Sequence, residues 1–229
     1  MLNVIYLNQR TFDGSLAEDS DTGFSVIPTI DDGYAVLGDT GSQSTGEWYT
    51  CLVKTDASGV EEWNHTFEDP LNSIIQIADG SFIISGDDFS LLKTDVNGQE
   101  IWNTAYGTSR EEYLTSFIQT TDGGFLLIGT VGTVANDNDI WLLKTDMNGQ
   151  QEWNTTLGGS YEDSVSSVVQ VSDGGFVIAG STQPAGIENR DMWLLKVKVS
   201  EDSRTPGFEL GVFILTLSLL VLILRKRSQ

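Results

Sequence analysis

A cassette of eleven residues is written three times in this chain. Lys-Thr-Asp, two variable residues, Gly, three further residues and Trp-Asn occupy positions 54–64, 93–103 and 144–154. Each Lys precedes its Trp by nine residues, whereas successive cassettes begin 39 and 51 residues apart. The cassette is therefore a structural unit, and the variation in length lies between the units. A repeat of this period, made of short apolar runs and Gly-rich turns, predicts a radial or solenoid architecture.

A second landmark raises the number of copies to four. Asp-Gly-Gly-Phe occurs at 122–125 and 173–176, and variants of it stand at 31–34 and 79–82. The third copy shows the unit best, with strands expected at 114–121, 125–130, 140–145 and 152–157. Gly and Asn between these runs tolerate the positive φ that tight hairpin turns require. No helical periodicity interrupts them, so each copy is expected to be a four-stranded antiparallel sheet.

The third strand of each copy is apolar without alternation, as in 140–143 and 192–195, which is typical of a sheet covered on both faces. Four-stranded sheets repeated around an axis form a β-propeller. The sequence therefore predicts an all-β propeller of four four-stranded blades. The last copy stops after its third strand, and residues 4–12 end in Arg-Thr-Phe as 65–67 end in His-Thr-Phe. We expect this N-terminal strand to close the last blade; the alternative is a fragment of a larger ring, because Met1 falls inside a repeat.

The C-terminal segment is directed to a membrane. Residues 210–224 carry no charge, and Arg225, Lys226 and Arg227 follow directly. This pattern predicts a C-terminal transmembrane helix within 208–229, with its basic end in the cytoplasm and the propeller outside the cell. A buried hydrophobic element is the alternative. The expected domains are a repeat domain at 1–199, a linker at 200–207 and the membrane segment at 208–229. No export signal of the usual kind follows Met1, and a start codon further upstream would explain this.

Two resemblances add to this interpretation. The tail Thr-Pro-Gly-Phe-Glu at 205–209, with its apolar run and basic end, resembles archaeal C-terminal sorting signals of the PGF type, built here on Pro206, Gly207 and Phe208. That resemblance implies processing by an archaeosortase-like transpeptidase and attachment to a lipid. Residues 1–199 resemble archaeal and bacterial cell-surface β-propeller repeats, through Trp-Asn-x-Thr, Asp-Gly-Gly-Phe and Trp-Leu-Leu-Lys-Thr-Asp. They also resemble in part the Asp-box and quinoprotein docking turns, which are structural in their families.

Composition excludes several classes of function. The formal net charge of −21 would repel nucleic acid. One cysteine, Cys51, rules out an intramolecular disulfide framework and a multi-thiolate zinc site, and its place in an apolar strand favours a buried hydrophobe. A single histidine, His65, leaves no His-based triad. We therefore expect a non-catalytic binding module without a cofactor, although calcium is possible. The alternatives are a glycosidase-like enzyme acting through paired carboxylates, or a purely structural envelope protein.

The two ends of every blade should differ. Loops after the second and fourth strands share one end, here named the loop end, where long variable segments lie at 41–47, 131–139 and 183–191. The tight turns share the opposite turn end. Between the fourth strand of one copy and the first strand of the next, each blade brings an acidic pair to the loop end. The pairs are Glu18 and Asp19, Glu68 and Asp69, Glu111 and Glu112, and Glu162 and Asp163. If the four pairs converge, their carboxylates would favour binding of calcium or of a basic partner surface. Otherwise each pair is solvated or hydrogen-bonded within its own loop.

Other recurrent residues are expected to serve the fold. Lys54, Lys93, Lys144 and Lys196 should lay their stems on the blade and pair with a nearby carboxylate. Trp63, Trp102 and Trp153 should pack between blades, whereas Trp48 and Tyr49 are the more exposed aromatic candidates. Asn64 and Asn154 satisfy the glycosylation triplet on outer strands. The expected partners are the membrane and an unknown extracellular protein, glycan or cation, with no nucleic acid.

Overall fold

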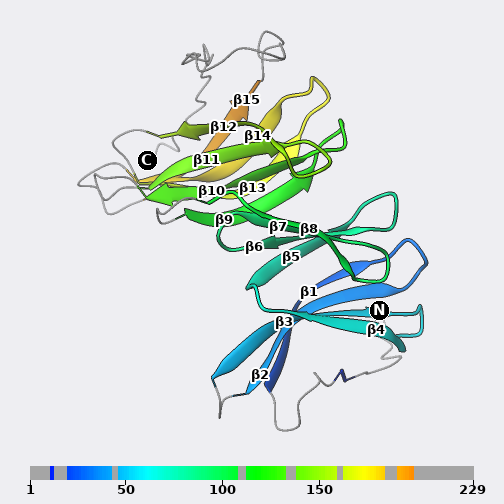
Figure 1. Ribbon diagram of the computed structural model, residues 1–229. Coiled ribbons are helices and arrows are strands. Elements are labelled where there is room, and N and C mark those ends of the chain that lie inside the picture. The colour runs from blue at the N-terminus through cyan, green and yellow to red at the C-terminus, as the bar shows by residue number, and fades with distance from the viewer. Residues whose placement is uncertain are drawn as a thin grey trace, which may run out of the picture. The chain divides into compact units, whose positions relative to one another are not determined.

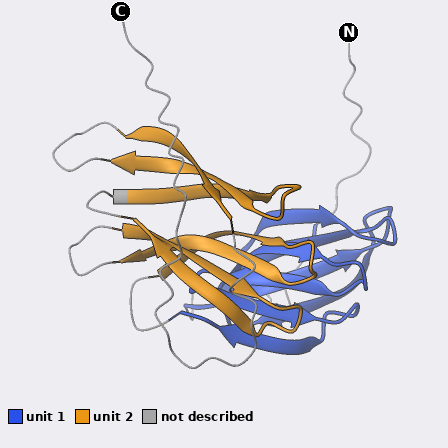
Figure 2. Ribbon diagram, turned by 90° about the horizontal axis from the view of Figure 1, so that it is seen from above, with its two compact units in different colours: residues 1–107 blue, residues 108–229 orange. Residues whose placement is uncertain are grey.

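The described part of the chain consists of β-strands joined by short turns (Figure 1). This computed structural model describes residues 11–12, 20–42, 46–107, 112–132, 138–158, 162–183 and 190–198. Contacts divide the chain into two compact units, residues 1–107 and 108–229 (Figure 2). Each unit contains two antiparallel sheets in which strands follow one another in chain order.

In unit 1, the first sheet contains β1 (Ser20–Pro28), β2 (Tyr34–Ser42), β3 (Glu47–Thr55) and β4 (Glu61–Phe67), and the second contains β5 (Leu71–Gln76), β6 (Phe82–Gly86), β7 (Ser90–Thr94) and β8 (Glu100–Ala105). In unit 2, the third sheet contains β9 (Glu112–Gln119), β10 (Phe125–Gly132), β11 (Asn138–Thr145) and β12 (Gln151–Leu157), and the fourth contains β13 (Glu162–Gln170), β14 (Phe176–Gln183) and β15 (Asp191–Val197). A four-stranded meander of this kind is the blade of a β-propeller.

Aspartate side chains build the turns that the sequence predicts. Asp122 Oδ1 accepts a hydrogen bond from Gly124 N at 3.1 Å, and Asp173 does the same for Gly175 N at 3.1 Å. In the turn after the third strand, an aspartate accepts two backbone hydrogen bonds. Asp146 Oδ1 accepts bonds from the backbone N of Asn148 and of Gln150, both at 2.8 Å. Such local bonds close the hairpins without help from the rest of the fold.

Each first strand carries a β-bulge that the sequence analysis did not foresee. Pairing between β5 and β6 skips Asn72, and pairing between β13 and β14 skips Ser166. The first and third sheets skip Phe24 and Thr115 at the equivalent position. Opposite the bulge the second strand always has a glycine, namely Gly38, Gly86, Gly129 or Gly180. A Cβ on Gly180 would run into Ser164 O, so the close approach of the two backbones at this bulge requires glycine.

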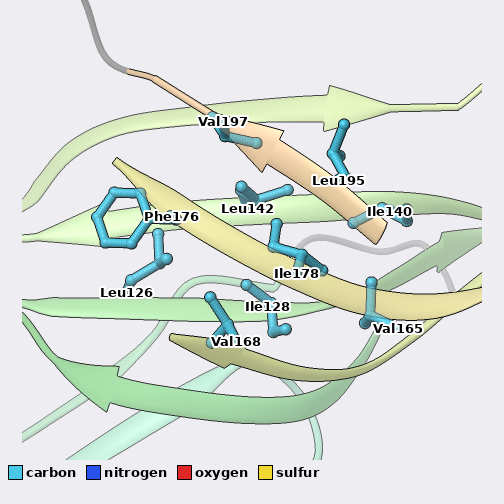
Figure 3. Packing of buried hydrophobic residues seen from close by; sticks show 10 residues of the cluster. All are labelled: Leu126, Ile128, Ile140, Leu142, Val165, Val168, Phe176, Ile178, Leu195 and Val197. Atoms are coloured by element: carbon cyan, nitrogen blue, oxygen red, sulfur yellow. The ribbon is translucent and has the colours of Figure 1, made fainter. Parts of the chain in front are cut away.

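Each unit has an apolar core between its two sheets. In unit 1, buried residues of β2 and β3 pack on buried residues of β5, β6 and β7: Ala35, Leu37, Leu52, Leu71, Ile74, Phe82, Ile84 and Leu92. In unit 2, β10 and β11 contribute Leu126, Ile128, Ile140 and Leu142 to the core (Figure 3). These residues pack on Val165, Val168, Phe176, Ile178, Leu195 and Val197. One face of each sheet is therefore buried against its neighbour in the same unit.

The all-β prediction and the division into four repeated sheets are confirmed. In the third copy the strands extend nearer the loop end than expected, because β10 continues to Gly132 and pairs there with Asn138 at the start of β11. Among the described residues the fourth sheet has three strands. The predicted closing strand lies outside the described residues except for Thr11 and Phe12.

The predicted linker and membrane segment, including Pro206, Gly207 and Phe208, also lie outside the described residues. They stay predictions. Within the described residues, no helix is long and apolar enough to span a membrane.

Candidate functional site

The turn end of the sheets is built around the recurrent lysines, whose predicted pairing with carboxylates is confirmed. Lys54 Nζ donates to Asp31 Oδ2 and to Glu62 Oε2, both at 2.7 Å, and to Thr55 O at 2.9 Å. Lys144 repeats this arrangement with Asp122 at 3.1 Å, Glu152 at 3.0 Å and Thr145 O at 2.7 Å. Lys93 lies 3.6 Å from Asp79, and Lys196 lies 2.6 Å from Asp173. The lysine of each cassette thus ties the third strand to the Asp-Gly turn.

These contacts shift the pKa values of the groups that form them. The hydrogen bond from Lys54, helped by one from Thr29, lowers the pKa of Asp31 to about 2. Burial alone would lower the pKa of the Lys54 ammonium, but its hydrogen bonds to the two carboxylates outweigh burial and raise it. Both groups are therefore charged at neutral pH, and carboxylates of the turn end balance the charge of this lysine.

The loop end of unit 1 holds a different arrangement, built on the bulge in β5. The bulged Asn72 donates from Nδ2 to Asp87 Oδ1, and its Oδ1 accepts from Ser85 Oγ at 2.8 Å. Asp39 follows Gly38, the glycine opposite the bulge of the first sheet, and stands at the repeat position that Asp87 occupies after Gly86. Burial, followed by repulsion from Asp87, raises the pKa of Asp39. Carboxylates from neighbouring sheets are therefore near enough to repel each other at this end of unit 1.

Asp69, from the predicted acidic pairs, is fixed beside this arrangement. Its Oδ2 accepts a hydrogen bond from Asn103 Nδ2 at 2.7 Å, and its backbone O accepts one from Thr50 Oγ1 at 3.0 Å. The same hydroxyl accepts from Leu71 N at 3.0 Å. Glu68 and Asp69 are both exposed. The segment between β4 and β5 is thus held on two strands while it presents both carboxylates at the surface.

The other predicted pairs are only partly described. Glu18, Asp19, Glu111 and the side chain of Glu162 lie outside the described part. Glu112, Glu162 and Asp163 were expected in loops, and this placement was wrong, because β9 begins at Glu112 and β13 at Glu162. Strand pairing continues to these residues, because Val131 of β10 pairs with Glu112 and Gln183 of β14 pairs with Glu162. Among the described residues, no three His, Cys, Asp or Glu side chains are grouped to hold a metal ion.

The described lysines of unit 1 lie at one end of its sheets. Its described residues include two lysines and no arginine, and both lysines, Lys54 and Lys93, lie at the turn end in ion pairs. The loop end carries acidic residues from five different segments: Asp21, Asp39, Glu47, Glu68, Asp69, Asp87 and Asp88. The turn end also carries acidic residues, among them Asp31, Glu62 and Asp79, and the two described lysines of unit 1 pair with these three.

The aromatic and cysteine predictions have mixed outcomes. Trp63 packs on the core between the sheets of unit 1, with its ring 5.9 Å from that of Phe82, and Trp153 packs on the core of unit 2, as predicted. Trp48 is exposed, as expected. Cys51 is only half-buried, but burial, followed by repulsion from Asp21 and Glu61, raises the pKa of its thiol to about 11.

The candidate glycosylation residues Asn64 and Asn154 are both exposed, on β4 and β12. Asn64 Nδ2 donates to Glu61 Oε1 at 2.6 Å. Their modification stays a prediction.

Sequence reasoning missed Asp39 and Asn72. Asp39 and Asp87 are 48 positions apart, and their proximity follows from the packing of two sheets. A signal was nevertheless present, because an isolated glycine inside a strand pattern indicates a bulge. The glycines at 38 and 86 share one repeat position, and each is followed by aspartate.

Neutralising Asp39 should stabilise the protein at neutral pH. Because its folded-state pKa is raised, the ionised carboxylate opposes folding, and this cost disappears as pH falls below the unfolded pKa of about 3.9. We expect Asp39→Asn to raise the unfolding free energy by about 0.5 kcal/mol at pH 7, with the gain vanishing near pH 3. Urea titrations at both pH values measure this difference. Asp32→Asn removes the same charge at the turn end and should change little; a gain equal to that of Asp39→Asn would refute a local cause.

Comparisons with known proteins place the chain in no family. No protein-family model and no curated protein match it. Among solved structures, a protein of unknown function from Bacteroides caccae is similar at 16% identity and TM-score 0.47, over 79% of this chain and 58% of that chain. HIRA(644-1017) is similar at 13% identity and TM-score 0.37, over 78% and 53%. BamB from Moraxella catarrhalis is similar at 14% identity and TM-score 0.34, over 77% and 64%. This chain thus spans between about half and two thirds of the length of these structures.

Proposed function

We propose that this chain is a non-catalytic binding module of the cell surface, and that its acidic loop end binds a positively charged partner. Exposed carboxylates at the end of unit 1 opposite its two described lysines carry the proposal. Those lysines form ion pairs at the turn end, whereas Glu68, Asp69, Asp87 and Asp88 are exposed at the loop end. A surface of one sign attracts a partner of the opposite sign and accelerates its association.

The structural setting supports binding rather than mere solubility. The bulge in β5 directs Asn72 to Asp87, and Asn103 fixes Asp69, so two of the carboxylates are held in place. Such preorganisation reduces the conformational entropy that these side chains lose when a partner binds. The acids are spread along the surface, which suits a basic protein segment with several cations. Calcium is the simpler alternative, since carboxylates are its preferred ligands.

The rest of the proposal concerns where the module works. A membrane segment at 208–229 with the sorting residues Pro206, Gly207 and Phe208 would hold the repeat domain outside the cell, with four blades closed by the N-terminal strand. Anchoring at one end leaves the loop end of the blades free to meet a soluble or surface-bound partner.

An oligolysine peptide tests the site on the full-length chain. We expect the triple variant Glu68→Gln, Asp87→Asn and Asp88→Asn to weaken binding about tenfold, since each exposed charge contributes about 0.5 kcal/mol. The matched control is Asp32→Asn, Glu61→Gln and Glu100→Gln, which removes the same charge from the turn end. Isothermal calorimetry at low salt measures both. Equal weakening by the two triples would contradict a site at the loop end.

Calcium provides the second arm of the experiment. If the ion itself is the ligand, millimolar calcium raises the melting temperature of the wild-type chain by mass action, and the loop-end triple loses that shift. If the partner is a basic segment, calcium changes the melting temperature little, and the peptide result stands. If the loop-end triple variant changes neither the binding of oligolysine nor the effect of calcium on the melting temperature, the proposed function is wrong.

A further inference from the structure

An exposed tryptophan, Trp48, packs on a glycine at the loop end of the first sheet. Its side chain is 49% exposed. Trp48 of β3 pairs with Gly41 of β2, and a Cβ added to Gly41 would lie 2.9 Å from Cδ2 of the indole. A side chain at position 41 would therefore collide with the ring. The indole leans over the backbone of β2 at this glycine, and much of its surface stays open to a partner.

The alternation of side chains along β2 and β3 brings Asp39 to the same face of the sheet as Trp48. Asp39 pairs with Thr50, which lies two residues along β3 from Trp48. Because successive side chains of a strand point to opposite faces, Trp48 and Thr50 share the face that carries Leu52 into the core of unit 1. Asp39 and Trp48 are thus diagonal neighbours on this face, a separation that an aromatic side chain can span.

The segment after β4 adds carboxylates to this face. Thr50 Oγ1 donates to the backbone O of Asp69 at 3.0 Å. The strand position next to Trp48 on this face therefore holds the segment that carries Glu68 and Asp69, and both of these residues are exposed. The indole consequently lies beside acidic residues from two segments of unit 1.

The third and fourth sheets show that the fold requires neither the indole nor these carboxylates. In β11, Asn138 pairs with Gly132 in the same way that Trp48 pairs with its glycine. The equivalent residues in unit 2 are uncharged and none is aromatic: Asn138 for Trp48, Thr130 for Asp39 and Ser181 for Asp87. Since the same strand pairing forms around these neutral residues, the indole and the carboxylates are additions to the scaffold.

Asp39 also makes the free protein less stable. Burial, followed by repulsion from Asp87, raises the pKa of its carboxyl group, so the ionised form opposes folding at neutral pH. A cation held beside Asp39 would offset that repulsion. Ionisable groups in such unfavourable settings are typical of binding sites.

We propose that Trp48, together with Asp39 and Asp69, binds an arginine side chain of the basic partner. A guanidinium group is planar, so it can stack on the indole while its N–H groups donate to neighbouring carboxylates. The ammonium group of lysine is a compact and more strongly hydrated charge, and it gains less from an aromatic surface. This inference rests on the proposed function, because it names the residue type that the acidic loop end recognises in its partner.

Peptides of six arginines and of six lysines test the proposal on the full-length chain, because the two peptides carry the same charge. We expect the wild-type chain to bind the arginine peptide about fivefold more tightly, which is the size of one cation–π contact. Trp48→Leu should remove this preference and weaken binding of the lysine peptide by about twofold at most. The matched control is Tyr34→Leu, at an aromatic residue 44% exposed at the turn end of the same sheet, and it should leave both affinities unchanged. Isothermal calorimetry at low salt measures the four affinities.

Fluorescence provides a second readout, because the difference between the spectra of the wild type and of Trp48→Leu isolates the emission of this indole. We expect the arginine peptide to quench that emission. Equal affinity of the wild type for the two peptides, or a preference for arginine that persists in Trp48→Leu, would overturn the proposal but leave the acidic loop end as the site of oligolysine binding. If neither peptide binds, the proposed function and this inference are both wrong. Quenching by neutral maltohexaose and not by the arginine peptide would overturn the proposal in favour of a glycan.

Discussion

Replacing Lys54 by methionine should cost about 2 kcal/mol of unfolding free energy. Methionine keeps the apolar stem but removes three hydrogen bonds, to Asp31, Glu62 and Thr55 O. The two carboxylates are partly exposed and can be solvated, so the loss stays below that of a fully buried ion pair. The remaining cost comes from charge-assisted bonds and from a carbonyl left without its partner.

Lys196→Met is the matched control for Lys54→Met. Lys196 holds the same repeat position, but its side chain is 51% exposed, compared with 4% for Lys54, and it makes one ion pair, with Asp173. An exposed pair of this kind contributes less than about 1 kcal/mol. Urea unfolding of both variants, followed by tryptophan fluorescence, compares them. Equal losses would mean that burial does not determine the contribution of this lysine.

The same lysine determines part of the response to acid. The pKa of Asp31 is lowered to about 2, mainly by the bond from Lys54, so Asp31 stabilises the fold above its unfolded pKa of about 3.9 and loses this contribution as pH falls towards 2. We therefore expect the stability difference between wild type and Lys54→Met to shrink between pH 4 and pH 2. Because Asp31 is about half exposed, solvent screening keeps its share near 1 kcal/mol.

Gly124→Ala should destabilise the protein by about 3 kcal/mol. A Cβ at this position would overlap Thr145 O and lie 2.6 Å from Lys144 Nζ. The turn would have to move away from β11, which breaks the contact between Lys144 and Asp122. Overpacking against a fixed backbone costs about 1 to 3 kcal/mol, and the lost ion pair adds to it.

Its neighbour Gly123 provides the control. Gly123 has φ of +87° and nothing within 4 Å of its ideal Cβ, so Gly123→Ala should cost about 1 kcal/mol, from backbone strain alone. The chain itself tolerates a side chain there, because Asp32 occupies the equivalent position with φ of +65°. Thermal unfolding of both variants measures the difference. A loss for Gly123→Ala as large as that for Gly124→Ala would refute the steric argument.

The parts of the fold that depend on local chemistry could be predicted from the sequence. Asp146 closes its turn with bonds to residues two and four positions away, and such a turn can be recognised from Asp-x-Asn-Gly alone. The constant spacing between Lys54 and Trp63 likewise indicated a fixed role for the lysine. Packing of one sheet on another follows from the repeated apolar runs, which place Leu52 and Phe82 in one core.

The parts that depend on contacts between sheets could not be predicted in this way. The bulge at Asn72 is a property of the ladder, since it depends on how two strands align around Gly86. Asp87 repels the Asp39 carboxylate because two sheets pack on each other. Glu112 was placed in a loop because the strand was expected to begin at 114, whereas the backbone already pairs from Glu112.

The bulge has a consequence for how such a protein can diversify. At Phe24, Asn72, Thr115 and Ser166 the four repeats carry four different side chains, although the glycine opposite is constant. Because the extra residue takes no part in the ladder, its identity can change without loss of a strand-to-strand bond. Each sheet thus has one position near its loop end where the side chain can change without disturbing the pairing of the strands. New recognition chemistry can arise at that position.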